Sequence, residues 1–400
     1  MTANQPEAGP CAATGREAHH PVPVIFLIDH IWSGHGGTEG QLLQLIAGLD
    51  RRRFEPRLVV LYDRSEFIHS DQVPCPCRCL GLQSRRQARY WRLLAAEARA
   101  IRRVGPAILH TTFPESVTAG PWLARLAGAP HVTWRRDLGY WITPGVRRLL
   151  RWSSRWTACC VTNSEAVRAA VIRNEGLRPG QLAVVRNTVD LAELEQVRPQ
   201  NVGAALNLPP GTVSLVFPAN LRPVKGGDIV LAALARARAA GARLHLVSIG
   251  ENSFVIDEYR RRCEELHLSD AVTFLGHLPR GELLSWVKGC DIAVNASYSE
   301  GYSNSNVETM VLQRPLIATA VGGNLEQVSD DETGCLVPAG NAEAMAAALL
   351  DLYHDPARRL ALGAAGAQRM RALHGTDEMA ARHEAIYARV LAAAGKTNAG

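Results

Sequence analysis

Two glutamates, Glu300 and Glu308, stand at the two ends of one polar segment that is rich in glycine, serine and asparagine. An apolar run over residues 291–295 precedes the segment, and apolar residues at helical spacing follow it. The pattern predicts a strand that ends in a loop and enters a helix. Ligands bind where the strands of open α/β sheets end, and a helix N-terminus suits an anion. A phosphate group within reach of both carboxylates is therefore predicted.

Glu308 also has a purely structural interpretation. Ser305 and Glu308 have the spacing of a capping box, in which each side chain would bind a backbone amide at the start of the helix. The spacing alone does not decide between a cap and a ligand-binding carboxylate.

Arg222 and Lys225 supply two cations in another loop, which follows the apolar run Val213–Phe217 and ends in two glycines. An arginine offers phosphate a two-pronged fork and a lysine a compact point charge. Lys225 is one of only three lysines beside 41 arginines, which suggests a specific use, although solvated loop charges are the alternative. The two cations are expected to face the same crevice as the glutamates.

Strand and helix patterns alternate in two rounds along the chain, which predicts two doubly wound, Rossmann-like α/β domains with parallel sheets. Because ligand pockets concentrate between domains, the loops are expected to face a cleft. The predicted order is a disordered tail over 1–21, a first domain over 22–195, a linker over 196–211, a second domain over 212–375, and a C-terminal helix and tail over 376–400 that pack back on the first domain.

The first domain carries two further candidates at predicted strand ends. Gly36 and Gly37 would let a ligand approach the backbone closely, but they lack the spacing of a dinucleotide fingerprint or a P-loop. His110 ends the apolar run 107–110 and is predicted either to contact substrate or to be structural.

Composition bounds the class of protein. The 400 residues are 47% hydrophobic and 20% charged, which is typical of a globular protein with room for two cores. No apolar run has the length of a membrane span and residues 1–20 lack a signal-peptide core, so a cytoplasmic location is expected. Cys75, Cys77 and Cys79 lack zinc-finger spacing and are interpreted as reduced, structural thiols.

Positive charge is concentrated in the first half of the chain. Residues 1–205 hold 26 arginines and 17 acidic residues, a net charge of +9, whereas residues 206–400 have a net charge of −3. Arginine and aromatic residues interleave over 85–92 and 147–156, which favours docking on the anionic inner face of the plasma membrane rather than on nucleic acid. Solvated helix faces with buried tryptophans are the alternative.

A set of short motifs, in this order along residues 22–390, resembles the retaining glycosyltransferases of the GT-B fold, in the group 1 family (glycosyltransferase family 4). The segment 135–139 is similar to members that build bacterial exopolysaccharide or lipopolysaccharide. The family often has His-x-His and Asn-Gly where this chain has His110-Thr111-Thr112 and Asn187-Thr188. The motifs that carry the resemblance are Gly36-Gly37-x-Glu39, Asn163-Ser164-Glu165, Asn187-x-x-Asp190, Arg222-x-x-Lys225-Gly226, Glu300-x7-Glu308, and Gly322-Gly323 followed by Glu326.

The resemblance implies roles for individual residues. Arg222 and Lys225 would hold the diphosphate of a nucleotide-sugar donor, and Glu300 would contact the donor sugar near its reacting carbon. Glu308 would bind the ribose hydroxyls, and Gly36 and Gly37 would admit the acceptor and phosphate. The other implied donor-binding residues are Gly250, Gly301, Tyr302, Ser303 and Asn304, and His110 joins the catalytic group.

The implied activity is transfer of a sugar with retention of configuration to a lipid-linked glycan acceptor in cell-envelope or exopolysaccharide biosynthesis. No Asp-x-Asp motif occurs, so no metal or other cofactor is expected, and fixed cations would stabilise the departing phosphate. Two alternatives remain. The first is a non-hydrolysing nucleotide-sugar epimerase, an enzyme that shares the two-domain architecture. The second is a protein without catalytic activity, a subunit that only binds a nucleotide sugar.

Overall fold

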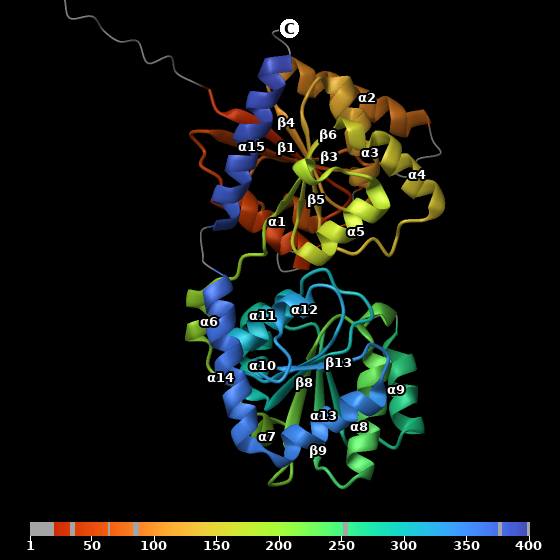
Figure 1. Ribbon diagram of the computed structural model, residues 1–400, viewed down its shortest axis with the longest axis vertical. Helices are drawn as coiled ribbons and strands as arrows, with labels where there is room; N and C mark the ends of the chain where they lie inside the picture. Colours follow the sequence, from red (N-terminus) through yellow and green to blue (C-terminus); the bar gives the residue numbers. More distant parts are fainter. Residues whose placement is uncertain are drawn as a thin grey trace, which may run out of the picture.

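The computed structural model describes residues 20–32, 37–62, 65–82, 88–250, 255–374 and 378–397. Two α/β domains stand one above the other, with the loops at one end of each sheet directed toward the other domain (Figure 1). The tail predicted to be disordered lies, over residues 1–19, outside the described residues.

Each domain is built on a parallel sheet, and the prediction of two doubly wound α/β domains is confirmed. Among the described residues the first sheet has the strand order β3-β2-β1-β4-β5-β6-β7 and the second β10-β9-β8-β11-β12-β13. The strands of the first sheet are β1 Val22–Ile28, β2 Phe54–Val60, β3 Cys77–Cys79, β4 Ile108–Thr111, β5 His131–Arg135, β6 Thr157–Thr162 and β7 Leu182–Val184. Those of the second are β8 Val213–Pro218, β9 Leu244–Ile249, β10 Val272–Gly276, β11 Ile292–Asn295, β12 Leu316–Thr319 and β13 Cys335–Val337.

Helices cover both faces of each sheet, which explains why the central strands are buried along almost their whole length and are mainly apolar. The helices before the linker are α1 Gly37–Gly48, α2 Ala88–Val104, α3 Pro114–Ala127, α4 Pro144–Ser153 and α5 Glu165–Glu175. The helices that follow along the chain, from the segment between the domains onward, are α6 Leu191–Gln196, α7 Val202–Ala205, α8 Gly227–Ala239, α9 Ile256–Glu265, α10 Arg280–Gly289, α11 Asn304–Val311, α12 Asn324–Gln327, α13 Ala342–His354, α14 Pro356–Leu373 and α15 Glu378–Thr397.

The strand order of the second sheet creates the crevice. β8 lies between β9 and β11, so the chain runs outward from β8 in one direction and returns on its other side as β11. The loops that follow β8 and β11 therefore diverge at a topological switch point, where doubly wound sheets bind ligands. These two loops carry Lys225 and Glu300.

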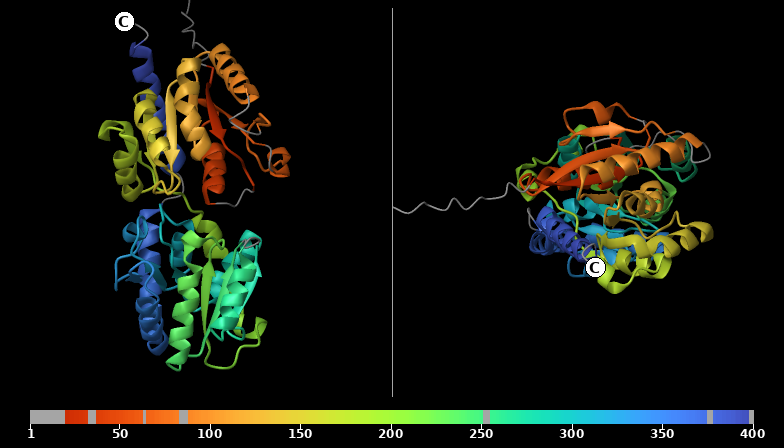
Figure 2. Two further views of the ribbon diagram at one scale, coloured as in Figure 1. Left: turned by 90° about the vertical axis from the view of Figure 1, so that its right-hand side faces the viewer. Right: turned by 90° about the horizontal axis from the view of Figure 1, so that it is seen from above.

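The chain passes between the domains twice. Val189 and Leu194, which the sequence assigned to the first domain, pack in an apolar cluster of the second because β7 is the last strand of the first sheet. At the other end, α14 packs along the second domain and α15 lies against the first, where Met379 and Tyr387 join its core (Figures 1 and 2).

The cysteine segment forms the edge strand β3, which the sequence did not predict because the strand is only three residues long. Cys75, Cys77 and Cys79 are free thiols that pack, partly buried, against the first-domain core. Burial raises the pKa of Cys75 and of Cys77 to about 11, so both thiols stay protonated at neutral pH.

Candidate functional site

The loop after β8 holds Lys225 beside the end of β11. A short 3₁₀ turn, Pro223–Lys225, ends at Gly226, whose φ of 67° is left-handed. A Cβ at Gly226 would lie 2.1 Å from the carbonyl oxygen of Ala296, so only glycine fits this close approach. The turn is thereby held against the loop after β11. Arg222, at the start of the turn, is exposed.

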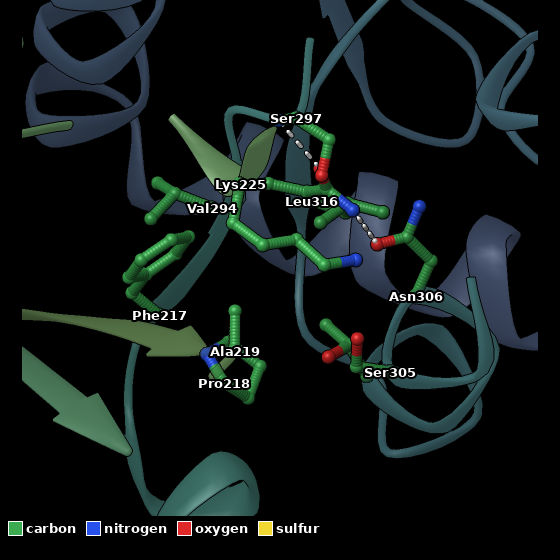
Figure 3. A pocket seen from close by; sticks show the side chains of 11 residues that line it. Phe217, Pro218, Ala219, Lys225, Val294, Ser297, Ser305, Asn306 and Leu316 are labelled. Carbon is green, nitrogen blue, oxygen red and sulfur yellow. Dashed lines mark hydrogen bonds between the residues drawn. The ribbon is translucent and has the colours of Figure 1, made fainter. Parts of the chain in front are cut away.

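Lys225 and Glu300 form an ion pair at the switch point. The Lys225 Nζ lies 2.6 Å from Glu300 Oε2, and the Ser297 hydroxyl donates to the same oxygen at 3.2 Å. Their side chains are 29% and 13% exposed, so a mostly buried carboxylate meets a cation that solvent and ligands can still reach. Figure 3 shows the Lys225 side chain extending across a small pocket toward Ser305 and Asn306 at the start of α11.

The start of α11 is capped by Ser303, whose hydroxyl accepts a hydrogen bond from the Asn306 amide. Ser305 is therefore already inside the helix, and the capping-box interpretation of Ser305 and Glu308 is wrong. Glu308 lies a turn further along, where its carboxylate accepts from Arg280 instead. The spacing of Ser305 and Glu308 predicted the wrong cap, because the helix begins two residues earlier, after Ser303.

Buried side-chain amides fix the loop between β11 and α11 from the interior of the domain. The Asn295 Nδ2 donates to Asn306 Oδ1 at 2.7 Å, and the Asn306 Nδ2 donates to Asn324 at 2.9 Å and to Gln327 at 3.0 Å. Because these side chains satisfy one another in the interior, the loop is held in one arrangement. Asn306 was not among the predicted site residues, since its polar neighbours lie in other elements, Asn295 at the end of β11 and Asn324 and Gln327 in α12.

Glu308 belongs to a chain of three charges. Arg280 Nη1 lies 2.6 Å from Glu308 Oε1, and Arg280 Nε lies 2.9 Å from Glu193 Oε2. Burial raises the pKa of Glu308, and Arg280 partly offsets this increase. Neither Arg280 nor Glu193 was predicted, because they come from α10 and from the segment between the domains.

The first domain meets the same loop directly. The Ser164 hydroxyl donates to the Gly301 carbonyl at 2.8 Å, and Asn187 Nδ2 lies 2.5 Å from Asn304 Oδ1. A Cβ at Gly301 would lie 2.1 Å from the carbonyl oxygen of Arg136. The loop that carries Glu300 is thus part of the interface between the domains.

Two more motifs that the sequence singled out lie at this interface. The amide of Ala166, at the start of α5, donates to Glu326 Oε1 at 2.9 Å. Gly322 and Gly323 lie against the backbone of the loop that carries Glu300. A Cβ at Gly322 would lie 2.0 Å from the carbonyl oxygen of Glu300, and a Cβ at Gly323 would lie 2.0 Å from that of Gly301. The structure therefore brings together motifs from both halves of the chain.

The remaining second-domain candidates take different positions. Gly250, with φ of 153°, ends β9 beside the loop after β8, where a Cβ would meet the Ala219 carbonyl oxygen. The Tyr302 side chain points into the interior, where its hydroxyl lies 2.8 Å from His374 Nε2, so its backbone rather than its ring belongs to the loop.

In the first domain, Gly36 lies outside the described residues. Gly37 begins α1, and its carbonyl accepts from Arg136 Nη2 at 3.0 Å and from Asn304 Nδ2 at 3.2 Å. The start of α1 therefore reaches the loop that carries Glu300.

His110 does not join the site. Its side chain is 1% exposed, its Nδ1 lies 2.6 Å from the hydroxyl of Tyr387 in α15, and its ring stacks on His383. Burial lowers the pKa of His110 well below its usual range, so the ring is neutral. The structure contradicts the predicted contact with substrate, because α15 covers the end of β4 and makes His110 a core residue.

Among the described residues, no group of three or more His, Cys, Asp or Glu side chains is placed to hold a metal ion. No helix in the described ranges is both long and apolar enough to span a membrane.

Two family models match the chain, "Glycosyl transferases group 1" over residues 203–369 and "Glycosyltransferase Family 4" over residues 35–193. Among curated proteins, the D-inositol 3-phosphate glycosyltransferase of Streptosporangium roseum is 31% identical over 243 residues, which cover 58% of this chain and 55% of that protein. The protein of the same name from Pseudarthrobacter chlorophenolicus is 28% identical over 239 residues, covering 59% and 54%. The chain thus spans about half the length of these relatives.

Among solved structures, Anabaena Alr3699/HepE in complex with UDP and glucose superposes with a TM-score of 0.79 at 18% sequence identity. The match covers 92% of this chain and 100% of that one, so the two proteins share the fold of both domains and the connection between them.

Proposed function

This chain belongs to the group 1 glycosyltransferases of family 4 and has the GT-B fold, and from that premise we propose that it transfers a sugar from a nucleotide-diphosphate sugar to an acceptor. The observation that carries the proposal is the Lys225–Glu300 pair at the switch point of the second sheet, facing the first domain. Lys225 and Arg222 would hold the diphosphate, Glu300 the donor sugar and Glu308 the ribose.

The chemistry needs fixed charges at these positions. Breaking the bond between the anomeric carbon and the diphosphate leaves positive charge on the sugar and negative charge on the diphosphate. Lys225, Arg222 and the amides at the start of α11 would stabilise the negative charge without a metal ion. We further propose that the acceptor attacks from the face of the leaving group, so that configuration is retained and a phosphate oxygen takes the acceptor's proton.

A panel of nucleotide sugars tests this proposal. In buffer that contains EDTA, one donor is expected to raise the melting temperature, because a ligand at 100 times its Kd adds about 2.7 kcal/mol of stability. With acceptor added, transfer is expected to proceed in the same buffer. A donor that is epimerised without acceptor would favour an epimerase, and activity that returns only with added Mg²⁺ or Mn²⁺ would contradict metal independence.

The acceptor has two candidate classes. We propose a lipid-linked glycan of the cell envelope or an exopolysaccharide, reached by docking on the membrane, because the first domain is basic and exposes tryptophan. The names of the curated relatives favour a second candidate, a small acceptor that carries phosphate. Binding to membranes separates the two.

Three tryptophans of the first domain pack on one another near its surface. Trp122 of α3 lies 4.5 Å from Trp152 of α4 and 4.7 Å from Trp156, measured between ring centroids. Trp152 is 46% exposed, and the Arg155 guanidinium lies 4.1 Å from its ring centroid. Aromatic rings beside cations are typical of the headgroup region of a membrane. The exposed arginines nearby on α4 are Arg147, Arg148 and Arg151.

We expect the full chain to sediment with vesicles that contain anionic lipid and to be released by salt. Changing Arg147, Arg148 and Arg151 together to Gln should weaken binding on the order of a hundredfold, since each basic residue near an anionic surface contributes about 1 kcal/mol. The control is the same change at Arg260, Arg261 and Arg262, three exposed arginines on α9 of the second domain. Equal losses in the two variants, or no binding at low salt, would favour the small acceptor.

A further inference from the structure

Arg280 joins two carboxylates that come from different parts of the chain. Its Nε lies 3.0 Å and 2.9 Å from the two oxygens of Glu193, and its Nη1 lies 2.6 Å from Glu308 Oε1. The side chains of Arg280 and Glu308 are only 26% and 14% exposed. A guanidinium with both edges engaged has a fixed plane, so it orients the carboxylates that it binds.

We propose that Arg280, anchored by Glu193, is a positioning residue that aims the Glu308 carboxylate at the ribose hydroxyls of the donor nucleotide. This inference rests on the proposed function. Glu308 binds Arg280 through Oε1, which leaves Oε2 to accept from a ligand. Arg280 would act on the donor only through Glu308.

The ion pair also controls the charge of Glu308. Ribose hydroxyls donate hydrogen bonds, so the ionised carboxylate is the better acceptor. Burial raises the pKa of Glu308, and Arg280 opposes that increase. Without Arg280 the pKa would rise further, so that donor affinity would fall as the pH is lowered through this raised pKa and would recover at higher pH.

Among the described residues, Arg280 and Glu193 are the charged groups that act on Glu308. Arg280 of α10 stabilises its ionised form and Glu193 of α6 opposes it. The charged residues on other helices packed around α11 have different partners: Arg369 binds the carbonyls of Glu326 and Gln327, Arg371 pairs with Glu195, and Glu326 binds the Ala166 amide.

Glu193 extends the network to the segment between the domains. It lies on α6, three residues beyond Asp190, whose side chain caps that helix. Through Asn187, the same segment contacts Asn304 at the start of α11, directly after the loop that carries Glu300. Through Arg280, the position of the Glu308 carboxylate therefore depends on the segment that joins the domains.

The test is calorimetry with whichever of UDP, ADP and GDP raises the melting temperature of the wild type most. Arg280→Gln should bind it about tenfold more weakly than the wild type near pH 6, because loss of a charged hydrogen bond costs this much. Near pH 8 the loss should be smaller but still measurable, because the Glu308 carboxylate is no longer held in position. Arg280→Lys, which keeps the charge, should largely restore affinity near pH 6. Comparison with the wild type at each pH cancels the titration of the ligand itself.

Two further comparisons separate positioning from a role in stability alone. The 2′,3′-dideoxy form of the same nucleotide should bind the wild type and Arg280→Gln equally. Glu308→Gln should bind the nucleotide weakly at both pH values, and adding Arg280→Gln to that variant should not lower the affinity further. Glu195→Gln, a neighbour of Glu193 on the same helix, is the matched control and should bind as the wild type does.

Unchanged affinity of Arg280→Gln at both pH values, or penalties that add in the double variant, would overturn the proposal. Glu308→Gln with normal affinity would remove Glu308 as the ribose ligand and leave the proposed function intact. A wild type that binds none of the three nucleotides, nor any nucleotide sugar, would refute the proposed function itself.

Discussion

Changing Lys225 to alanine is expected to lower kcat/KM for sugar transfer about a hundredfold or more, which is the usual loss when one preorganised charge is removed from a leaving group. The Lys225 side chain is 29% exposed beside the Glu300 side chain, which is only 13% exposed, so an incoming diphosphate can share this cation. Much of the loss is expected in kcat, because charge on the diphosphate increases as the glycosidic bond breaks.

The fold should tolerate the change. Lys225 lies in a loop, and partly exposed ion pairs contribute about 0–1 kcal/mol to stability, so the melting temperature should change little. Lys288→Ala is the matched control, because Lys288 lies on α10 and donates to the Val197 carbonyl rather than to a carboxylate of the site. Transfer at the wild-type rate by Lys225→Ala would exclude Lys225 from the donor site.

The sequence predicted the parts of this site that depend on local pattern. Apolar runs bounded by glycine-rich loops located β8 and β11, and the rule that ligands bind where parallel strands end placed Lys225 and Glu300 on the same edge. The structure pairs these two side chains at 2.6 Å. The sequence alone could place both charges, because each lies in the loop that follows a run of mainly apolar residues.

The sequence alone could not predict contacts between residues that are far apart along the chain. Arg280 and Glu193 are 87 residues apart, and neither stands in a motif. His110 was misassigned for the same reason, since the helix that buries it, α15, lies 277 residues along the chain at Tyr387. A strand end predicts a position on the edge of a sheet, but not whether another helix covers that position.

Replacing Gly301 with alanine is expected to reduce kcat about a hundredfold, because a displacement of about 1 Å at a reacting centre has this cost. The new Cβ would lie 2.1 Å from the Arg136 carbonyl oxygen, and real Cβ atoms essentially never come within 3.0 Å. The obstacle is backbone of the other domain, which cannot rotate away as a side chain can. Either the loop with Glu300 or the whole first domain must move.

Nucleotide affinity should be affected less than kcat, since Lys225 and Glu308 both belong to the second domain and pair with Glu300 and Arg280 of that domain. The measurements are kcat and the Kd of the nucleoside diphosphate. Gly145→Ala is the control, because among the described residues no atom outside the adjoining backbone of its own helix lies within 4 Å of that Cβ. A normal kcat in Gly301→Ala would mean that the close contact of Gly301 with Arg136 is absent while sugar is transferred. A reduced kcat with normal nucleotide affinity would show that transfer requires the first domain to be seated on this loop, as the Ser164–Gly301 hydrogen bond indicates.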